Sequence, residues 1–265
     1  MIQKRLFLVI LFFLNSEIMF SQDSIFAKEQ SKILLFTDNF LGFDNQQNYY
    51  SISNNVLSKT NSNSKFEYKN VSLGKITHVD FQNPLQIIVF YNDFNTAVLL
   101  DNQLNEIKII DFNLLSEAVN IDAIALSSQN QLWIYDAISS KIGLYNLNND
   151  AIKWISTPLD SLIKHYKSNF TRFYWLNDKN NFLSISIYGT IETFADFPAF
   201  EKIQLINNKI LLYYNDNQLF FYDIAKKQSI KIKITENFVA NFFFADGILA
   251  IFTENKITNY NIILP

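Results

Sequence analysis

The feature that most constrains this chain is a series of short apolar runs, separated by Asn, Asp, Gly and Ser, which recurs from residue 85 to residue 262. Runs of this length that are rich in β-branched and aromatic residues are typical of strands, and few segments show sustained helical periodicity. The separating residues supply the positive φ that tight hairpin loops require, as in Asn207-Asn208, Asn215-Asp216-Asn217 and Asp246-Gly247. Neighbouring runs are therefore predicted to pair as antiparallel hairpins.

The hairpins form a repeating unit. Each copy has an apolar strand, an Asn or Asp turn, a strand that ends in an aromatic residue or Leu followed by Asp or Asn, and a further strand. Three copies align on Tyr145, Tyr222 and Tyr260, and a weaker copy from Phe182 to Phe194 fills the wider first interval. A period of roughly forty residues with three or four strands per unit is typical of a β-propeller rather than a helical solenoid.

The strands themselves favour the same fold. Stretches such as Ile87 to Tyr91 and Leu219 to Tyr222 are apolar at consecutive positions, so both faces of their sheets must be buried. A sandwich leaves one face of each sheet in water, whereas a propeller blade packs between two neighbours. We therefore predict an all-β fold, a β-propeller of about six blades with three to four antiparallel strands each. A β-sandwich or a two-domain β protein is the alternative.

In layout the copies resemble an exported bacterial β-propeller-like repeat protein. The resemblance is confined to layout, because the Gly-His and Trp-Asp marks of WD40 blades, the paired glycines of kelch and the Asp-box of sialidases are absent from a chain with 5 Gly. The chain ends after two strands of its last unit, so we expect Lys32 to Thr37 to complete that blade and close the ring. Residues 22–265 are thus predicted to form a single propeller domain closed by its N- and C-terminal strands.

The first residues have the composition of a secretion signal. Lys4 and Arg5 precede an apolar run from Leu6 to Leu14, and the small residue Ser21 suits the position before a cleavage site. We expect residues 1–21 to be a cleavable signal peptide, with an uncleaved N-terminal anchor as the alternative and no transmembrane segment after cleavage. The chain has no Cys, so no disulfide supports the fold and no lipid anchor can be attached through a cysteine.

Composition and motifs exclude several kinds of chemistry. A net charge of −3 argues against nucleic-acid binding. With 2 His, no Cys and no His-Glu-x-x-His motif, we expect no metal site, and we expect no cofactor. Gly-x-Ser-x-Gly and Gly-rich phosphate loops are also absent, so no catalytic residue is predicted.

Carboxylates that a propeller would bring together remain candidates for glycoside chemistry, although Asp and Glu at these positions are also explained by turn geometry. They are Asp93, Asp136, Glu192, Asp196, Asp216 and Asp246. His78 lies in a strand-like stretch, and His165 lies in the irregular segment Ser156 to Asn169, which has room for a short helix. The polar segment Asn45 to Asn70 is expected to include a long, partner-facing loop.

One cluster has the composition of a binding hot spot. Arg172 lies among aromatic residues that include Tyr174 and Trp175, and cation–aromatic clusters of this kind are enriched at interfaces. We predict Arg172, Tyr174 and Trp175 as binding residues.

An export signal, a repeated β chain and no reactive constellation together suggest a non-enzymatic binding or scaffolding propeller of the bacterial cell envelope. Its expected partner is an envelope or outer-membrane protein, and its expected location is the periplasm, the outer-membrane periphery or the medium. The alternative is an envelope or secreted glycan-active enzyme that uses funnel carboxylates as acid and base. A small-ligand sensor domain is a third hypothesis.

Overall fold

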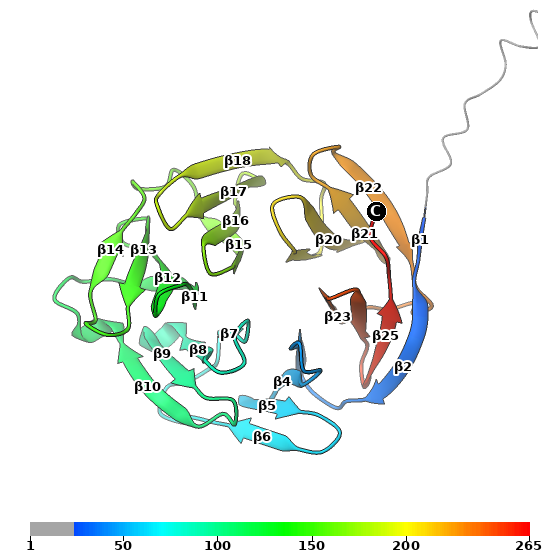
Figure 1. Cartoon of the computed structure of the whole chain (residues 1–265), viewed down its shortest axis with the longest axis horizontal. Helices are drawn as coiled ribbons and strands as arrows, with labels where there is room; N and C mark the ends of the chain where they lie inside the picture. The colour runs from blue at the N-terminus through cyan, green and yellow to red at the C-terminus, as the bar shows by residue number, and fades with distance from the viewer. Residues whose placement is uncertain (1–23) are drawn as a thin grey trace, which may run out of the picture.

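The structure is a computed structural model that describes residues 24–265, apart from the side chains of residues 195 and 196. Six antiparallel sheets are arranged around a central axis as the blades of a propeller (Figure 1). The predicted β-propeller fold is therefore confirmed, with six blades that each contain four antiparallel strands. The predicted signal peptide, residues 1–21, lies outside the described residues.

Within a blade the strands follow one another from the central channel to the outside. The first blade consists of β3 (Asn39–Phe43), β4 (Tyr49–Ser53), β5 (Val56–Thr60) and β6 (Lys65–Tyr68). The second consists of β7 (His78–Asp80), β8 (Ile87–Tyr91), β9 (Thr96–Leu100) and β10 (Glu106–Asp111). The third consists of β11 (Ile121–Leu126), β12 (Gln131–Asp136), β13 (Lys141–Asn146) and β14 (Ile152–Trp154). Two short 3-10 helices, η1 (Asn92–Phe94) and η2 (Phe112–Leu114), follow β8 and β10.

Of the last three blades, the fifth and sixth each gain a strand from the start of the described chain. The fourth blade consists of β15 (Ile163–Ser168), β16 (Arg172–Asn177), β17 (Asn181–Ser186) and β18 (Ile191–Asp196). The fifth consists of β19 (Lys202–Leu205), β20 (Ile210–Asn215), β21 (Gln218–Asp223) and β22 (Gln228–Lys233), and β1 (Ile25–Phe26) is added to it. The sixth consists of β23 (Asn241–Ala245), β24 (Ile248–Phe252) and β25 (Lys256–Asn261), completed by β2 (Lys28–Leu34).

The core lies between the blades, as the apolar runs predict. All five residues of β8 are buried. Ile88 and Phe90 pack toward the third blade, whereas Val89 and Tyr91 pack toward the first. Alternate residues of one strand thus belong to two different clusters, and each fully buried apolar side chain contributes about 1.5–3 kcal/mol of burial free energy.

The repeat and the turns identified in the sequence keep their positions in the fold. Tyr145, Tyr222 and Tyr260 lie in β13, β21 and β25, which are each the third strand, counted from the channel, of their blade. Asp216 and Asn217 have φ of 49° and 59° in the hairpin between β20 and β21, so this turn uses the positive φ that its residues tolerate.

The ring is closed by a strand from the start of the described chain (Figure 1). β2 pairs antiparallel with β25, with Lys28 opposite Asn261 and Leu34 opposite Lys256. The strand in this position begins at Lys28, earlier than the segment Lys32 to Thr37 that we expected. Its side chains are mostly exposed, so no apolar pattern fixes its register. The side chain of Asn259 donates to Ser31 across the pair at 3.1 Å. β1 adds a parallel partner to β22.

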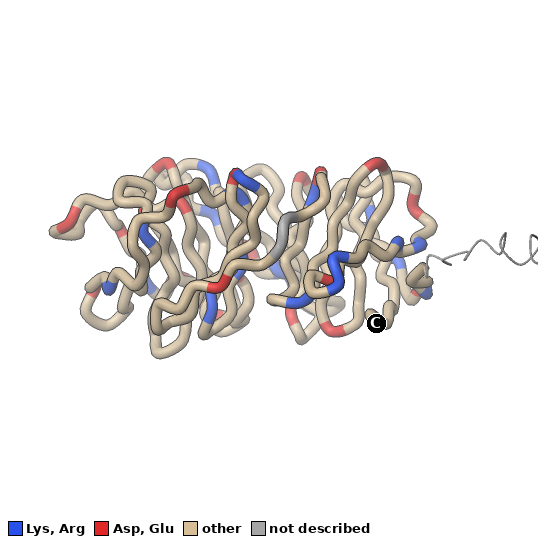
Figure 2. The backbone as a smooth tube through the Cα atoms, turned by 90° about the horizontal axis from the view of Figure 1, so that it is seen from above, with Lys and Arg blue, Asp and Glu red and all other residues tan. Residues whose placement is uncertain are grey.

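Two segments differ from expectation. Asn45 to Asn70 contains β4, β5 and β6 instead of a long loop, because Tyr50, Leu57 and Tyr68 bury enough surface against the second blade to hold an otherwise polar sheet. Ser156 to Asn169 contains β15 and no helix. Seen from the side the molecule is a flat disc, and charged residues of both signs are spread over it (Figure 2).

Candidate functional site

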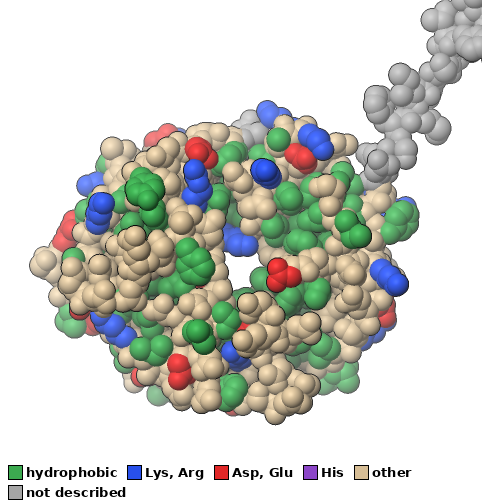
Figure 3. All heavy atoms as spheres, in the orientation of Figure 1, with side chains coloured by type: hydrophobic (Ala, Val, Ile, Leu, Met, Phe, Trp, Pro, Cys, Tyr) green, Lys and Arg blue, Asp and Glu red, His purple; other side chains and the backbone are tan. Residues whose placement is uncertain are grey.

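The central channel holds a cavity of about 570 Å³ to which the innermost strand of every blade contributes. These strands are β3, β7, β11, β15, β19 and β23, and the space-filling view shows the opening in the middle of the ring with side chains of both charges at its margin (Figure 3). A cavity of this volume is typical of small-molecule and peptide-segment sites. We call it the funnel.

The fourth blade supplies a polar stretch to the funnel. Lys164, His165, Tyr166 and Lys167 are consecutive residues of β15, and all four line the cavity. The pairing of β15 with β16 shifts register between Ile163 and His165. Such a bulge re-aims the side chains beside it, so charged residues at neighbouring positions can reach the same space.

Tyr166 and His78 link the second, third and fourth blades inside the channel. Their ring centroids are 4.9 Å apart, and the ring of Tyr166 also stacks on Phe173 at 5.5 Å. The backbone N–H of Ile124 donates to the Tyr166 hydroxyl at 3.4 Å. Burial raises the pKa of Tyr166, so its hydroxyl stays protonated and available as a donor.

The acidic group nearest to this cluster is already engaged. Asp80 accepts hydrogen bonds from the backbone N–H of Gln82 at 2.9 Å and from that of Leu126 at 2.7 Å, one on each carboxylate oxygen. It therefore joins the second blade to the third. Gln204 is used in the same way, because its amide both donates to and accepts from the backbone of Phe244.

Lys167 is the unusual charge of the funnel. Burial lowers the pKa of its ammonium group, and the negative charge of Asp80 opposes that effect. No described residue forms a hydrogen bond or an ion pair with it. Burial is also the main cause of the lowered pKa values of His78 and His165, so both imidazoles are neutral at pH 7.

An aromatic wall faces the channel from the sixth, first and second blades. Phe43 meets Phe243 edge to face with centroids 5.1 Å apart, and Phe81 lies 5.9 Å from the same ring. All three line the funnel, and Phe81 stacks on Tyr50 at 4.4 Å. One side of the funnel is therefore apolar, and the fourth blade on the opposite side carries Lys164, His165 and Lys167.

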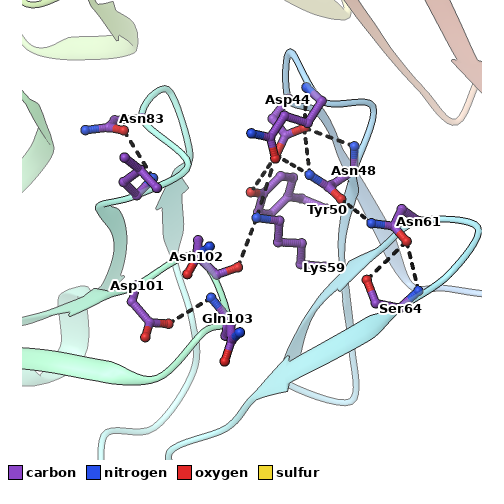
Figure 4. A network of polar contacts seen from close by, with 12 residues as sticks. Asp44, Asn48, Tyr50, Lys59, Asn61, Ser64, Asn83, Asp101, Asn102 and Gln103 are labelled. Carbon is purple, nitrogen blue, oxygen red and sulfur yellow. Dashed lines mark hydrogen bonds and ion pairs between the residues drawn. The ribbon is translucent and has the colours of Figure 1, made fainter.

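The rim beside this wall is fixed by a buried ionic network (Figure 4). The carboxylate of Asp44 accepts bonds from the backbone and side-chain amide of Asn48 and from the hydroxyl of Tyr50 at 3.1 Å. Lys59 lies 3.8 Å from the same carboxylate and donates to the carbonyl of Asn102 at 3.0 Å. The Asp44 and Lys59 side chains are only 1% and 5% exposed, so this pair has a structural role.

A second cavity, of about 610 Å³, lies at the seam between the sixth and first blades. Its described walls are uncharged, and Gln30, Gln47, Asn63 and Tyr49 are typical of them. The funnel differs because it collects residues from all six blades and concentrates the unpaired charge. We therefore treat the funnel as the candidate site.

The residues predicted as a binding hot spot are not gathered on the surface. Trp175 is 1% exposed and packs toward the third blade, whereas Tyr174 is 6% exposed and packs toward the fifth. Arg172 reaches the edge of the fourth blade, where it pairs with Glu192 at 2.9 Å and donates to Ser184 at 3.1 Å. Tyr174 and Trp175 therefore contribute to packing between blades, whereas Arg172 is paired within its own blade.

The candidate carboxylates are likewise scattered. Asp136 accepts backbone N–H bonds from Asn120 and Ser139, and Glu192 is held by Arg172. Of the candidates whose side chains are described, Asp246 alone lines the funnel. The side chain of Asp196 lies outside the description.

Sequence reasoning did not identify Lys164, Tyr166, Lys167 and Asp80 as funnel residues. The available signal was the polar run Lys-His-Tyr-Lys at the position where a repeat should place an inner strand. No group of three or more His, Cys, Asp or Glu residues suited to a metal ion occurs among residues 24–265. Within the same part of the chain, no helix has the length and apolar character to cross a membrane.

Comparison with known proteins supports the fold. No family model and no curated protein matches the chain. Among solved structures, a catalytically inactive virginiamycin B lyase from Staphylococcus aureus with quinupristin is 15% identical, with a TM-score of 0.57 over 88% of this chain and 99% of the lyase. A streptogramin B lyase is 14% identical, with a TM-score of 0.56 over 88% of this chain and 98% of that one.

A third similar structure is a member of the DUF4221 family from Bacteroides vulgatus. It is 10% identical, with a TM-score of 0.56 over 92% of this chain and 99% of that one. At these identities the likeness shows a shared six-bladed propeller fold. The fold serves proteins of different activities, so function must be argued from the site.

Proposed function

We propose that this chain is a non-enzymatic binding propeller of the bacterial cell envelope, which recognises a partner protein through its funnel. The observation that carries the proposal is that two acidic groups of the cavity are hydrogen-bonded within the protein, whereas its lysines are not. Its best-placed acidic groups, Asp44 and Asp80, already accept several protein hydrogen bonds, whereas Lys164 and Lys167 lack protein partners among the described residues. Such a cavity is suited to recognition.

The hydrogen bonding of these carboxylates also argues against the glycan-active alternative. General acid and base catalysis requires two carboxyl groups that can exchange protons with the substrate and with water. The oxygens of Asp80 are occupied by backbone donors, and Asp44 is enclosed by Asn48, Tyr50 and Lys59. Asp246, which also lines the funnel, then has no free acidic partner among the described funnel residues.

The expected export signal supports a location in the envelope. The basic residues, apolar run and small residue of positions 1–21 have the composition of a cleavable signal. An exported binding module acts on molecules of the periplasm, the outer membrane or the medium. We place the expected partner, an envelope or outer-membrane protein, at the open end of the funnel.

The test is affinity capture from envelope fractions, with residues 22–265 as bait and mass spectrometry as readout. Gln82 is exposed at the funnel, and Gln103 is exposed on an outer loop that does not line it. Gln82→Trp obstructs the funnel, and Gln103→Trp is the matched control. We expect the wild type and Gln103→Trp to capture the same partner, and Gln82→Trp to recover about tenfold less of it.

Equal recovery by the two tryptophan variants would contradict recognition through the funnel. Release of soluble saccharide from envelope glycans by the purified wild-type chain would contradict the non-enzymatic assignment.

A further inference from the structure

We infer that the funnel binds a carboxylate group carried on an apolar or aromatic body. The inference rests on the proposed function and specifies the chemistry that the funnel recognises. Its first support is the balance of hydrogen-bonding groups. The acceptors Asp80 and Gln204 are used within the protein, and the hydroxyl of Ser168 donates to the carbonyl of Leu126 at 3.1 Å.

The donors of the same cavity are left over. Lys164 and Lys167 have no hydrogen-bonded partner among the described residues, and Tyr166 retains its O–H for donation. The neutral imidazole of His78 adds one donor and one acceptor. The carboxylate of Asp246 also lines the cavity, but it comes from the sixth blade, whereas Lys164 and Lys167 lie together on β15 of the fourth. Two unpaired cations on one wall of a partly enclosed space favour an anion there. A carboxylate has two oxygens that can accept hydrogen bonds from these donors.

Lys167 provides the electrostatic reason. A partly buried ammonium group without a hydrogen-bonded counter-ion is costly, and Asp80 compensates only at a distance because its own oxygens face Gln82 and Leu126. An incoming carboxylate would supply the missing partner. The gain is larger here than on the surface, because the ring walls exclude part of the water.

The aromatic wall determines the rest of the ligand. Phe43, Phe81 and Phe243 stand on the side of the channel formed by the sixth, first and second blades, whereas Lys167 comes from the fourth. A ligand that spans the cavity therefore meets a cation at one end and aromatic rings at the other. A volume of about 570 Å³ accommodates an acid with one ring or a short peptide end.

Two sources carry this chemistry: a free organic acid, and the C-terminal carboxylate of a partner chain that ends in an apolar residue. The probes are 3-phenylpropionate for the first and N-acetyl-L-phenylalanine for the second, each compared with its neutral amide by calorimetric titration of residues 22–265. We expect at least one acid to bind, and its amide to bind about tenfold more weakly or not at all.

Two variants locate the binding. Lys167→Met removes the proposed cation, and Lys153→Met is the matched control on the outer strand β14, where Lys153 is exposed. We expect Lys167→Met to lower the acid's affinity about tenfold and Lys153→Met to leave it unchanged. Because Lys167 lacks a counter-ion contact among the described residues, the melting temperature of Lys167→Met should equal or exceed that of the wild type, which verifies that the variant folds.

The inference is overturned if neither acid binds at concentrations on the order of 10 mM, if acids and amides bind equally, or if Lys167→Met retains full affinity. Preference for N-acetyl-L-phenylalanine supports a chain terminus as the source, and preference for 3-phenylpropionate supports a free acid. Capture of a partner that depends on an open funnel, without any carboxylate binding, would refute this inference while leaving the proposed function in place.

Discussion

At the scale of single residues, the buried pair of Asp44 and Lys59 should matter most to stability. Asp44→Asn keeps the shape of the side chain but leaves Lys59, whose side chain is 5% exposed, without its counter-charge. We expect a loss of about 3–5 kcal/mol in the free energy of unfolding, measured by urea denaturation. Asp160→Asn, which breaks the exposed pair with Lys179, is the control and should change stability little. Equal effects would refute a structural role for the buried pair.

The two histidines predict how stability depends on pH. Burial lowers the pKa of both; at His78 the charge of Asp80 opposes the shift, and at His165 the charge of Lys164 adds to it. The unfolded chain therefore binds protons near pH 6.5, where the folded chain still resists them. Stability should be complete above that value and should fall as the pH is lowered through the folded-state pKa values.

The measurement is the melting temperature between pH 7.5 and about pH 5.5, above the range in which ordinary carboxylates titrate. Replacing both histidines with Gln should flatten the decline, because neutral amides take up no proton. The account fails if the double variant keeps the slope of the wild type. Tyr166 remains protonated across this interval, since its pKa is raised.

Single residues of the site were harder to predict than the fold. Strand alternation places Arg172 and Tyr174 on one face and Trp175 on the other, but which face meets water depends on the neighbouring blades. Trp175 packs toward the third blade and Tyr174 toward the fifth, and the sequence of β16 contains neither neighbour. Lys167 was not predicted as a site residue because its strand, β15, is polar and lacks the apolar run by which strands were identified in the sequence.

At the scale of elements, β2 should be more important than β1. A chain that begins at Leu35 lacks β2 and exposes the edge of β25, so it should aggregate or unfold. A chain that begins at Lys28 loses only β1 and the burial of Ile25, which amounts to about 1.5–3 kcal/mol. Size-exclusion chromatography and thermal melting distinguish the two. A folded monomer that begins at Leu35 would contradict this assignment.

Strands buried on both faces were predictable from sequence, and β15, which faces the channel, was not. Ile87 to Tyr91 is apolar at every position because β8 packs between two blades. β15 borders the channel on one side, so hydrophilic residues are tolerated there. Its sequence therefore lacks an apolar run, and the segment was expected to be irregular rather than a strand. The strands β4 to β6 of the first blade were missed for a related reason: few of their residues, chiefly Tyr50, Leu57 and Tyr68, are buried against the second blade.

At the scale of the whole molecule, the expected signal peptide leads to a prediction about the mature protein. Expression in a bacterium with the full chain should yield a periplasmic or extracellular product whose first residue is Gln22, as determined by N-terminal sequencing. Recovery of a membrane-bound product that begins at Met1 would instead support an uncleaved anchor. Replacing Ile10 and Leu11 with Arg interrupts the apolar run and should retain the chain in the cytoplasm.

The closure of the ring by β2 and β25 affects the order in which the molecule folds. Asn259 donates a hydrogen bond to Ser31, which lies 228 positions earlier in the sequence. Pairings between such distant residues form late, because the cost of closing the long loop must be met before any contact stabilises it. The blades can assemble from local hairpins as the chain emerges, but the row of blades stays open until the last strand has been made. The pairing of β2 with β25 thus determines the earliest moment at which a closed ring exists, after β25 has been made.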